Sequence, residues 1–121
     1  MSDSDCSRPS EPNSVATHTI RQLNDVFRQT FTGGTVLLTP GIQSAGGDHL
    51  SELLIRIRTF AAFSEDNDPN HEHDFGGLEW RGEKVFWKID YYDQDLQYHS
   101  PDPADASITT RVLTIMLARE Y

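Results

Sequence analysis

The chain has 121 residues, the usual size of one domain, and 36% of them are hydrophobic. Its formal net charge of −9 at pH 7 argues against direct binding to nucleic-acid phosphates. The only cysteine, Cys6, predicts a reducing compartment, and the acidic, polar start does not resemble a secretory signal. No apolar run approaches the roughly 18 residues of a membrane span. We therefore expect a cytoplasmic protein without membrane contact.

An amphipathic helix is predicted near the beginning of the chain. Residues 1–13 show no periodic apolar pattern, so we expect a disordered leader ahead of a single domain over residues 14–121. Ser14 is a favourable N-cap, with Arg21, Asn24, Asp25 and Arg28 expected on the polar side of the helix. The apolar positions repeat at helical spacing: Ile20, Leu23, Phe27 and Phe31.

A short strand and a second helix are predicted next. The glycine pair at 33–34 ends the first helix, and residues 35–39 read as a short buried strand closed by a turn at Pro40-Gly41. After the glycine pair at 46–47, apolar residues return at helical spacing. We expect this second helix to continue to about Phe63.

The clearest pattern in the chain is a β-hairpin. Residues 78–80 lead through 81–83 into the long alternating run 84–92. Residues 96–98 are predicted to add a short third strand. The hairpin residues expected to face the core are Val85, Trp87, Ile89 and Tyr91.

The last segment, residues 107–121, fits either a helix or a strand. Its apolar residues occupy one wide helical face, but the β-branched run at 112–115 suits both states. The length of the segment favours a helix. The summed order of elements predicts an α+β fold, with a small, mostly antiparallel sheet of three to four strands and about three helices packed on it.

Six blocks of sequence carry a resemblance to a known family. They are residues 20–25, 66–69, 72–76, 86–93, 100–103 and 110–118. These blocks resemble the bacterial family called domain of unknown function 3768, over roughly residues 20–121. That family has no established chemistry to transfer. Its members look like accessory proteins of proteobacteria on plasmids and other mobile elements, which implies a role in plasmid maintenance or in overcoming host defence.

The polar loop over residues 66–74 is the densest cluster of potential metal ligands. His71, His73 and Asp74 are of types that bind zinc, iron or manganese. An EF-hand register from Asp66 fails, because its sixth position is His71 rather than Gly and its twelfth is Gly77 rather than Glu. Turn formation and backbone capping by Asp66 or Asp68 explain the loop better. We expect no cofactor, with a divalent metal as the alternative.

Acidic residues are concentrated in one part of the chain. Residues 65–105 hold 12 of the 19 acids against three bases, so they carry the whole net charge. Clustered carboxylates imitate a row of phosphates and attract proteins that bind nucleic acid. We therefore favour a non-enzymatic binding protein with a basic partner, such as a DNA-mimicking inhibitor of a restriction or CRISPR nuclease. The candidate partner-binding residues are Glu65, Asp66, Asp68, Glu72, Asp74, Asp90, Asp93 and Asp95.

Other functions stay open at this point. One is a metal-dependent enzyme that uses the His71/His73 loop, with Asp90 or Asp93 as a further ligand. Another is a structural or oligomerising protein, and an acidic face can also serve solubility alone. No catalytic residue is assigned. Convergence of the loop acids in one cleft would favour chemistry, whereas an outward arrangement would favour binding.

Overall fold

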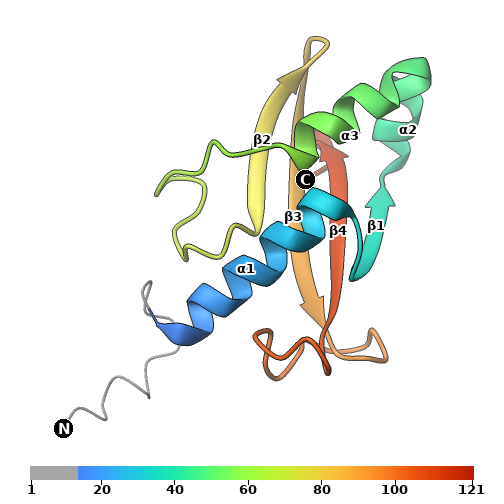
Figure 1. Cartoon of the computed structure of the whole chain (residues 1–121). Coiled ribbons are helices and arrows are strands. Elements are labelled where there is room, and N and C mark those ends of the chain that lie inside the picture. The colour runs from blue at the N-terminus through green and yellow to red at the C-terminus, as the bar shows by residue number, and fades with distance from the viewer. Residues whose placement is uncertain (1–13) are drawn as a thin grey trace, which may run out of the picture.

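A four-stranded β-sheet lies at the centre of the computed structural model, which describes residues 14–121 (Figure 1). The predicted leader, residues 1–13, lies outside the described residues. Neighbouring strands follow the order β1-β4-β3-β2. Their bounds are Gly34–Leu38 for β1, Phe75–Trp80 for β2, Glu83–Tyr92 for β3 and Thr110–Leu117 for β4.

The sheet is mixed, so the expectation of a mostly antiparallel sheet was wrong. Strand β3 pairs antiparallel with both β2 and β4, whereas β1 pairs with β4 in parallel. The chain can form this parallel pair because two helices and the hairpin separate β1 from β4. The predicted α+β class is confirmed.

The helices α1 and α3 lie across one face of the sheet (Figure 1). Helix α1 spans Val15–Thr30, α2 spans Pro40–Gly46 and α3 spans Leu50–Arg58. Short 3-10 turns cover Gly47–His49 (η2) and Ala118–Glu120 (η3). Within residues 14–121, none of the helices combines the length and the apolar character needed to cross a membrane.

Helix α1 begins as predicted, because the Ser14 hydroxyl accepts a hydrogen bond from the Thr17 amide at 3.0 Å. It ends at Phe31, whose φ of 57° breaks the helical path before the glycine pair. A turn was predicted at Pro40-Gly41, but the structure has α2 there. Thr39 caps this helix and Pro40 opens it.

Two further boundaries differ from the prediction. Helix α3 ends at Arg58 rather than near Phe63, because Phe60 and Phe63 leave the helix to pack edge-on against Trp87. The predicted strand at 96–98 is absent from the described residues, where a single bridge joins Tyr92 to His99. Strand β1 was expected to be buried, but it is an edge strand and is largely exposed.

The C-terminal segment is strand β4, so the predicted helix at 107–121 was wrong. Strand β4 lies between β1 and β3 and is buried along most of its length. A strand in that position is covered on both faces, and its sequence then reads as a continuous apolar run that periodicity cannot distinguish from a helix. Val112 on one face and Leu113 on the other are both buried.

The hairpin of β2 and β3 confirms the predicted core positions. Its turn, Arg81-Gly82, has positive φ at both residues, as a two-residue hairpin turn requires. The alternate residues of β3 point toward the helices and are buried: Val85, Trp87, Ile89 and Tyr91. They join one hydrophobic core with Ile20, Phe27, Ile42, Leu53, Ile57, Leu113 and Ile115.

Candidate functional site

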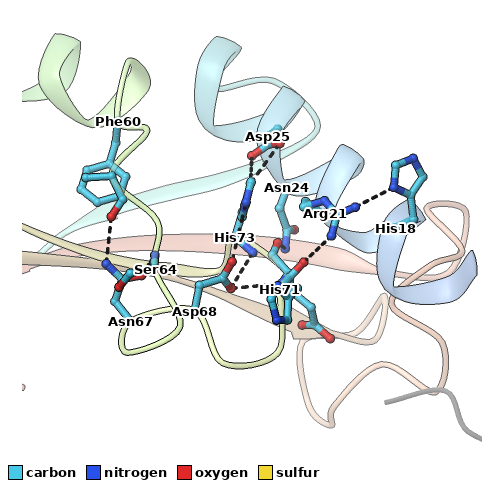
Figure 2. Close-up of polar contacts among 12 residues, drawn as sticks. His18, Arg21, Asn24, Asp25, Phe60, Ser64, Asn67, Asp68, His71 and His73 are labelled. Carbon is cyan, nitrogen blue, oxygen red and sulfur yellow. Dashed lines mark hydrogen bonds and ion pairs between the residues drawn. The ribbon is translucent and has the colours of Figure 1, made fainter. Parts of the chain in front are cut away.

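The polar face of α1 holds the long loop over residues 59–74, which we call loop 59–74 (Figure 2). The Arg21 guanidinium donates to the His71 carbonyl at 2.9 Å, and the Asn24 amide donates to the Glu72 carbonyl at 3.0 Å. Arg21 and Asn24 are three residues apart and therefore share a helix face. This face binds the backbone of the loop, whereas its polar side chains were expected to serve as an ordinary polar surface.

Arg28, from the same helix face, is a buried cation with 2% of its surface exposed. Its guanidinium carbon lies over the rings of Phe63 and Trp87, 5.3 and 5.2 Å from their centroids, within the range of cation–π attraction. Its guanidinium pairs with Asp25 at 3.1 Å and donates to the Phe60 carbonyl at 3.1 Å. Removal of Asp25 would leave this charge without its counter-ion inside the protein.

His73 connects loop 59–74 to α1 through a contact with Asp25 (Figure 2). Its Nδ1 lies 2.9 Å from one carboxylate oxygen of Asp25, and its Nε2 lies 3.6 Å from Asp68 Oδ2. Its ring stacks on Phe63 with 3.8 Å between centroids. Both His71 and His73 have left-handed backbones, with φ of 60° and 55°. Each nitrogen of His73 thus faces a carboxylate of the protein itself.

Asp68 shapes the loop from inside. Its side chain is buried, and one carboxylate oxygen accepts hydrogen bonds from the amides of Glu72 and His73 at 3.1 and 3.0 Å. Asp68 is therefore a turn-forming residue of the loop. This is the role that the sequence favoured over metal binding.

The predicted metal ligands are divided between two hollows. His71 and His73 line one of about 290 Å³, together with Phe63, Ser64, Glu65 and Asp68. Asp74 lines the other one. Over residues 14–121, no three His, Cys, Asp or Glu side chains are arranged to hold a metal ion.

A buried network connects α1, loop 59–74 and two strands through Tyr91. Asn24, with no exposed surface, donates to the Tyr91 hydroxyl at 2.7 Å and accepts from Arg111 at 2.7 Å. The Tyr91 hydroxyl donates to the Glu72 carboxylate at 2.8 Å. Burial raises the pKa of Tyr91, and burial lowers that of Arg111. Neither Asn24 nor Arg111 was predicted as a site residue. The signal was the spacing of Asn24, which is four residues after Ile20 and three before Phe27 and therefore lies at the border of the apolar stripe.

The second hollow, of about 350 Å³, lies beside the end of β3. It is lined by Asp74, Ile89, Asp90, Tyr91, Tyr92 and His99. Burial and the nearby carboxylate of Glu72 raise the pKa of Asp74 to about 6. Asp90 pairs with Lys88 at 3.0 Å. Ionisation of Asp74 is thus less favourable than that of an ordinary aspartate.

The loops between β3 and β4, residues 93–109, form one end of the molecule, opposite the β2–β3 turn (Figure 1). We call them the end loops. Asp93 accepts from the amides of Asp95 and Gln97 at 3.2 and 3.0 Å. Leu96 is 54% exposed and Tyr98 is 72% exposed. The acids of the end loops are therefore fixed by local turns, next to exposed apolar side chains.

The eight predicted partner-binding residues do not all meet in one place. Asp68 forms hydrogen bonds inside loop 59–74, the Glu72 carboxylate accepts a hydrogen bond from Tyr91 of β3, and Asp74 and Asp90 line the second hollow. The exposed or half-exposed remainder consists of Glu65 and Asp66 in loop 59–74 and Asp93 and Asp95 in the end loops.

A family model with the description "Protein of unknown function (DUF3768)" matches residues 38–120. The chain belongs to this family. No curated protein and no solved structure matches the chain. Helix α1 precedes the matched segment, yet its polar face holds loop 59–74 and completes the Tyr91 network. The polar network of this family member therefore extends beyond the matched residues.

Proposed function

We propose that the protein is a non-enzymatic acidic binding protein that engages a basic, nucleic-acid-binding partner. The observation that carries this proposal is the composition of the end loops. They hold four acids, Asp93, Asp95, Asp102 and Asp105, and no lysine or arginine. Such a surface attracts a basic partner over distances of about the Debye length.

The fixed positions of these carboxylates support binding. Asp102 accepts from the Ala104 amide at 3.1 Å, and Asp105 accepts from the Ser107 amide at 3.0 Å. The hydrogen bonds from Ser107 lower the pKa of Asp105, so its negative charge persists in mildly acidic solution. Because the turns already order these groups, the end loops lose less conformational freedom when a partner binds them.

Exposed apolar side chains beside the acids support a protein partner. Tyr98 and Leu96 offer contacts that a phosphate-binding surface of a partner can cover with its own apolar groups. Tyrosine is enriched among residues that dominate binding energy. A nuclease of a host defence system is the partner class that these carboxylates and the implied mobile-element habitat suggest together.

The proposal is tested by removing charge while the turns are kept. In the variant Asp93→Asn with Asp95→Asn, the amide oxygen of residue 93 can still accept the local hydrogen bonds. Wild-type protein immobilised on beads should recover a nucleic-acid-binding protein from host lysate at low salt, and about 0.5 M salt should release it. The double variant should recover much less of the same protein.

A matched control removes two charges from elsewhere. Asp48 and Glu79 are exposed and lie outside both loop regions, so Asp48→Asn with Glu79→Gln should retain most of the recovery. Equal losses for the two double variants, or recovery that salt does not weaken, would contradict a specific role for the end loops.

A further inference from the structure

The second hollow lies along the edge of β3, where β2 no longer pairs with it and the end loops have not yet reached it. The Ile89 amide donates to the Asp74 carbonyl at 2.8 Å, next to Phe75, the first residue of β2. Farther along β3, the Ser100 amide donates to the Tyr91 carbonyl at 3.0 Å, where the end loops take over. The hollow of about 350 Å³ lies between these two bonds. It therefore connects loop 59–74 to the end loops on the same edge of the sheet.

The charged groups that raise the pKa of Asp74 are all carboxylates. The carboxylates that act on it are Glu72, Asp68 and Asp90, and each raises the pKa of Asp74 in addition to burial. Lys88 is already paired with Asp90 at 3.0 Å. A positive charge placed at Asp74 would thus relieve repulsion that the protein itself does not compensate.

The aromatic lining suits an organic cation. Tyr92 and His99 face each other across an antiparallel bridge and both line the hollow. The faces of aromatic rings attract guanidinium and ammonium groups, and carboxylates supply hydrogen-bond acceptors for the same groups. An arginine or lysine side chain offers both the charge and the apolar stem that such a lining accommodates.

We propose that this hollow receives an arginine or lysine side chain of the basic partner, with Asp74 as its main carboxylate. This inference rests on the proposed function and names the chemistry of the partner at one point. The charged form of Asp74 is the one that binds the cation, so binding should strengthen as pH rises through about 6. The groups that face Asp74 are Glu72, Asp68, Asp90 and Tyr91, and His99 shares the hollow with it.

Two peptides of equal length provide the probe: nona-arginine and its neutral analogue nona-citrulline. Calorimetry at pH 7.5 and low salt should show that wild-type protein binds nona-arginine and that Asp74→Asn binds it about tenfold more weakly, because one charged contact is lost. The matched control Asp48→Asn removes the same charge from an exposed site outside both loop regions and should weaken binding less than about threefold.

The outcomes separate this inference from the proposed function. If Asp74→Asn and Asp48→Asn weaken nona-arginine binding equally, the hollow is not a cation site, while the end-loop surface is judged by its own double variant at residues 93 and 95. If wild-type protein prefers neither peptide, both proposals fail. A carbon-13 NMR titration adds an independent readout, because bound nona-arginine should lower the pKa of Asp74 from about 6. An unchanged pKa in the complex would overturn the inference.

Discussion

Loop 59–74 and the end loops carry five and four acidic residues, respectively, but the fold holds them differently. Loop 59–74 is fixed from outside by side chains of α1, and its Asp68 and Glu72 are used in internal hydrogen bonds. The end loops are fixed mainly by their own aspartates, which cap successive turns. Similar acidic composition thus contributes Asp68 and Glu72 to hydrogen bonds within the fold in one region, whereas in the other it forms turns that keep the carboxylates at the surface.

Removal of α1 should break this comparison most strongly. A chain that starts at residue 32 lacks the helix that holds loop 59–74, and it loses Ile20 and Phe27 from the core. We expect it to show no cooperative thermal unfolding, because loss of several core side chains exceeds the stability of a small domain. Circular dichroism on heating measures this. A chain that starts at residue 14 is the control and should unfold cooperatively, and cooperative unfolding of both would contradict the expectation.

The substitution Asn24→Leu should have the next largest effect. It keeps the branched shape of the side chain, with a larger volume, but leaves the buried Arg111 and the Tyr91 hydroxyl without a shared partner. We expect a loss of about 3 kcal/mol in the free energy of unfolding, measured with urea. Gln22→Leu, on the exposed side of the same helix, should change it by less than about 0.5 kcal/mol. Similar losses in both variants would show that the network contributes little.

The two histidines of loop 59–74 provide a matched pair. His73→Ala removes the stacking on Phe63 and the pair with Asp25, so it should lower the free energy of unfolding by about 1 to 2 kcal/mol. His71 has the same left-handed backbone, but it contributes its carbonyl to Arg21. His71→Ala should therefore cost less than about 0.5 kcal/mol. The reverse order in urea unfolding would refute the assigned role of His73.

The pH dependence of stability gives the smallest expected effect. The pKa of Asp74 is about 6 in the folded protein and its ordinary value is 3.8. Between these values the folded state holds the proton more tightly, so the contribution of Asp74 to stability falls as pH rises from about 4 to 6. Asp74→Asn should remove this fall and stabilise the protein at pH 7 by about 1 kcal/mol, discounted for solvent screening. Urea unfolding of wild-type and variant protein from pH 4 to pH 7 measures this difference in stability. Parallel pH profiles of the two proteins would contradict the expectation.

The sequence correctly predicted those elements whose structure is determined by residues close together in the chain. The hairpin alternation from Val85 to Tyr91 and the cap at Ser14 are both present, since each depends on residues close in the chain. Strand β4 was mistaken for a helix because its burial comes from neighbours on both sides, which are distant in sequence. Helix α2 was missed because Thr39 and Pro40 suit a turn as well as a helix start.

The candidate site was harder to predict than the fold. The acidic residues were identified from the composition of residues 65–105. Which of them are used inside the fold and which stay at the surface depends on contacts between residues about 20 to 90 positions apart, such as Arg111 with Asn24 and Tyr91 with Glu72. Asn24 was expected on the polar side of the helix, but its spacing from Ile20 and Phe27 places it beside the apolar stripe, where an amide requires a buried partner. The hollow at Asp74 lies where the pairing of β2 with β3 begins, at Phe75. No local sequence pattern specifies this position.

The parallel pairing of β1 with β4 has a consequence for synthesis of the protein. The partner of strand β1 emerges from the ribosome 77 residues later, because Gly34 pairs with Arg111. Until then α1 and α3 have no complete sheet to cover, and their apolar faces are open to other chains. Long-range strand pairing also slows folding. The growing chain is therefore most prone to aggregation just before its last strand is made.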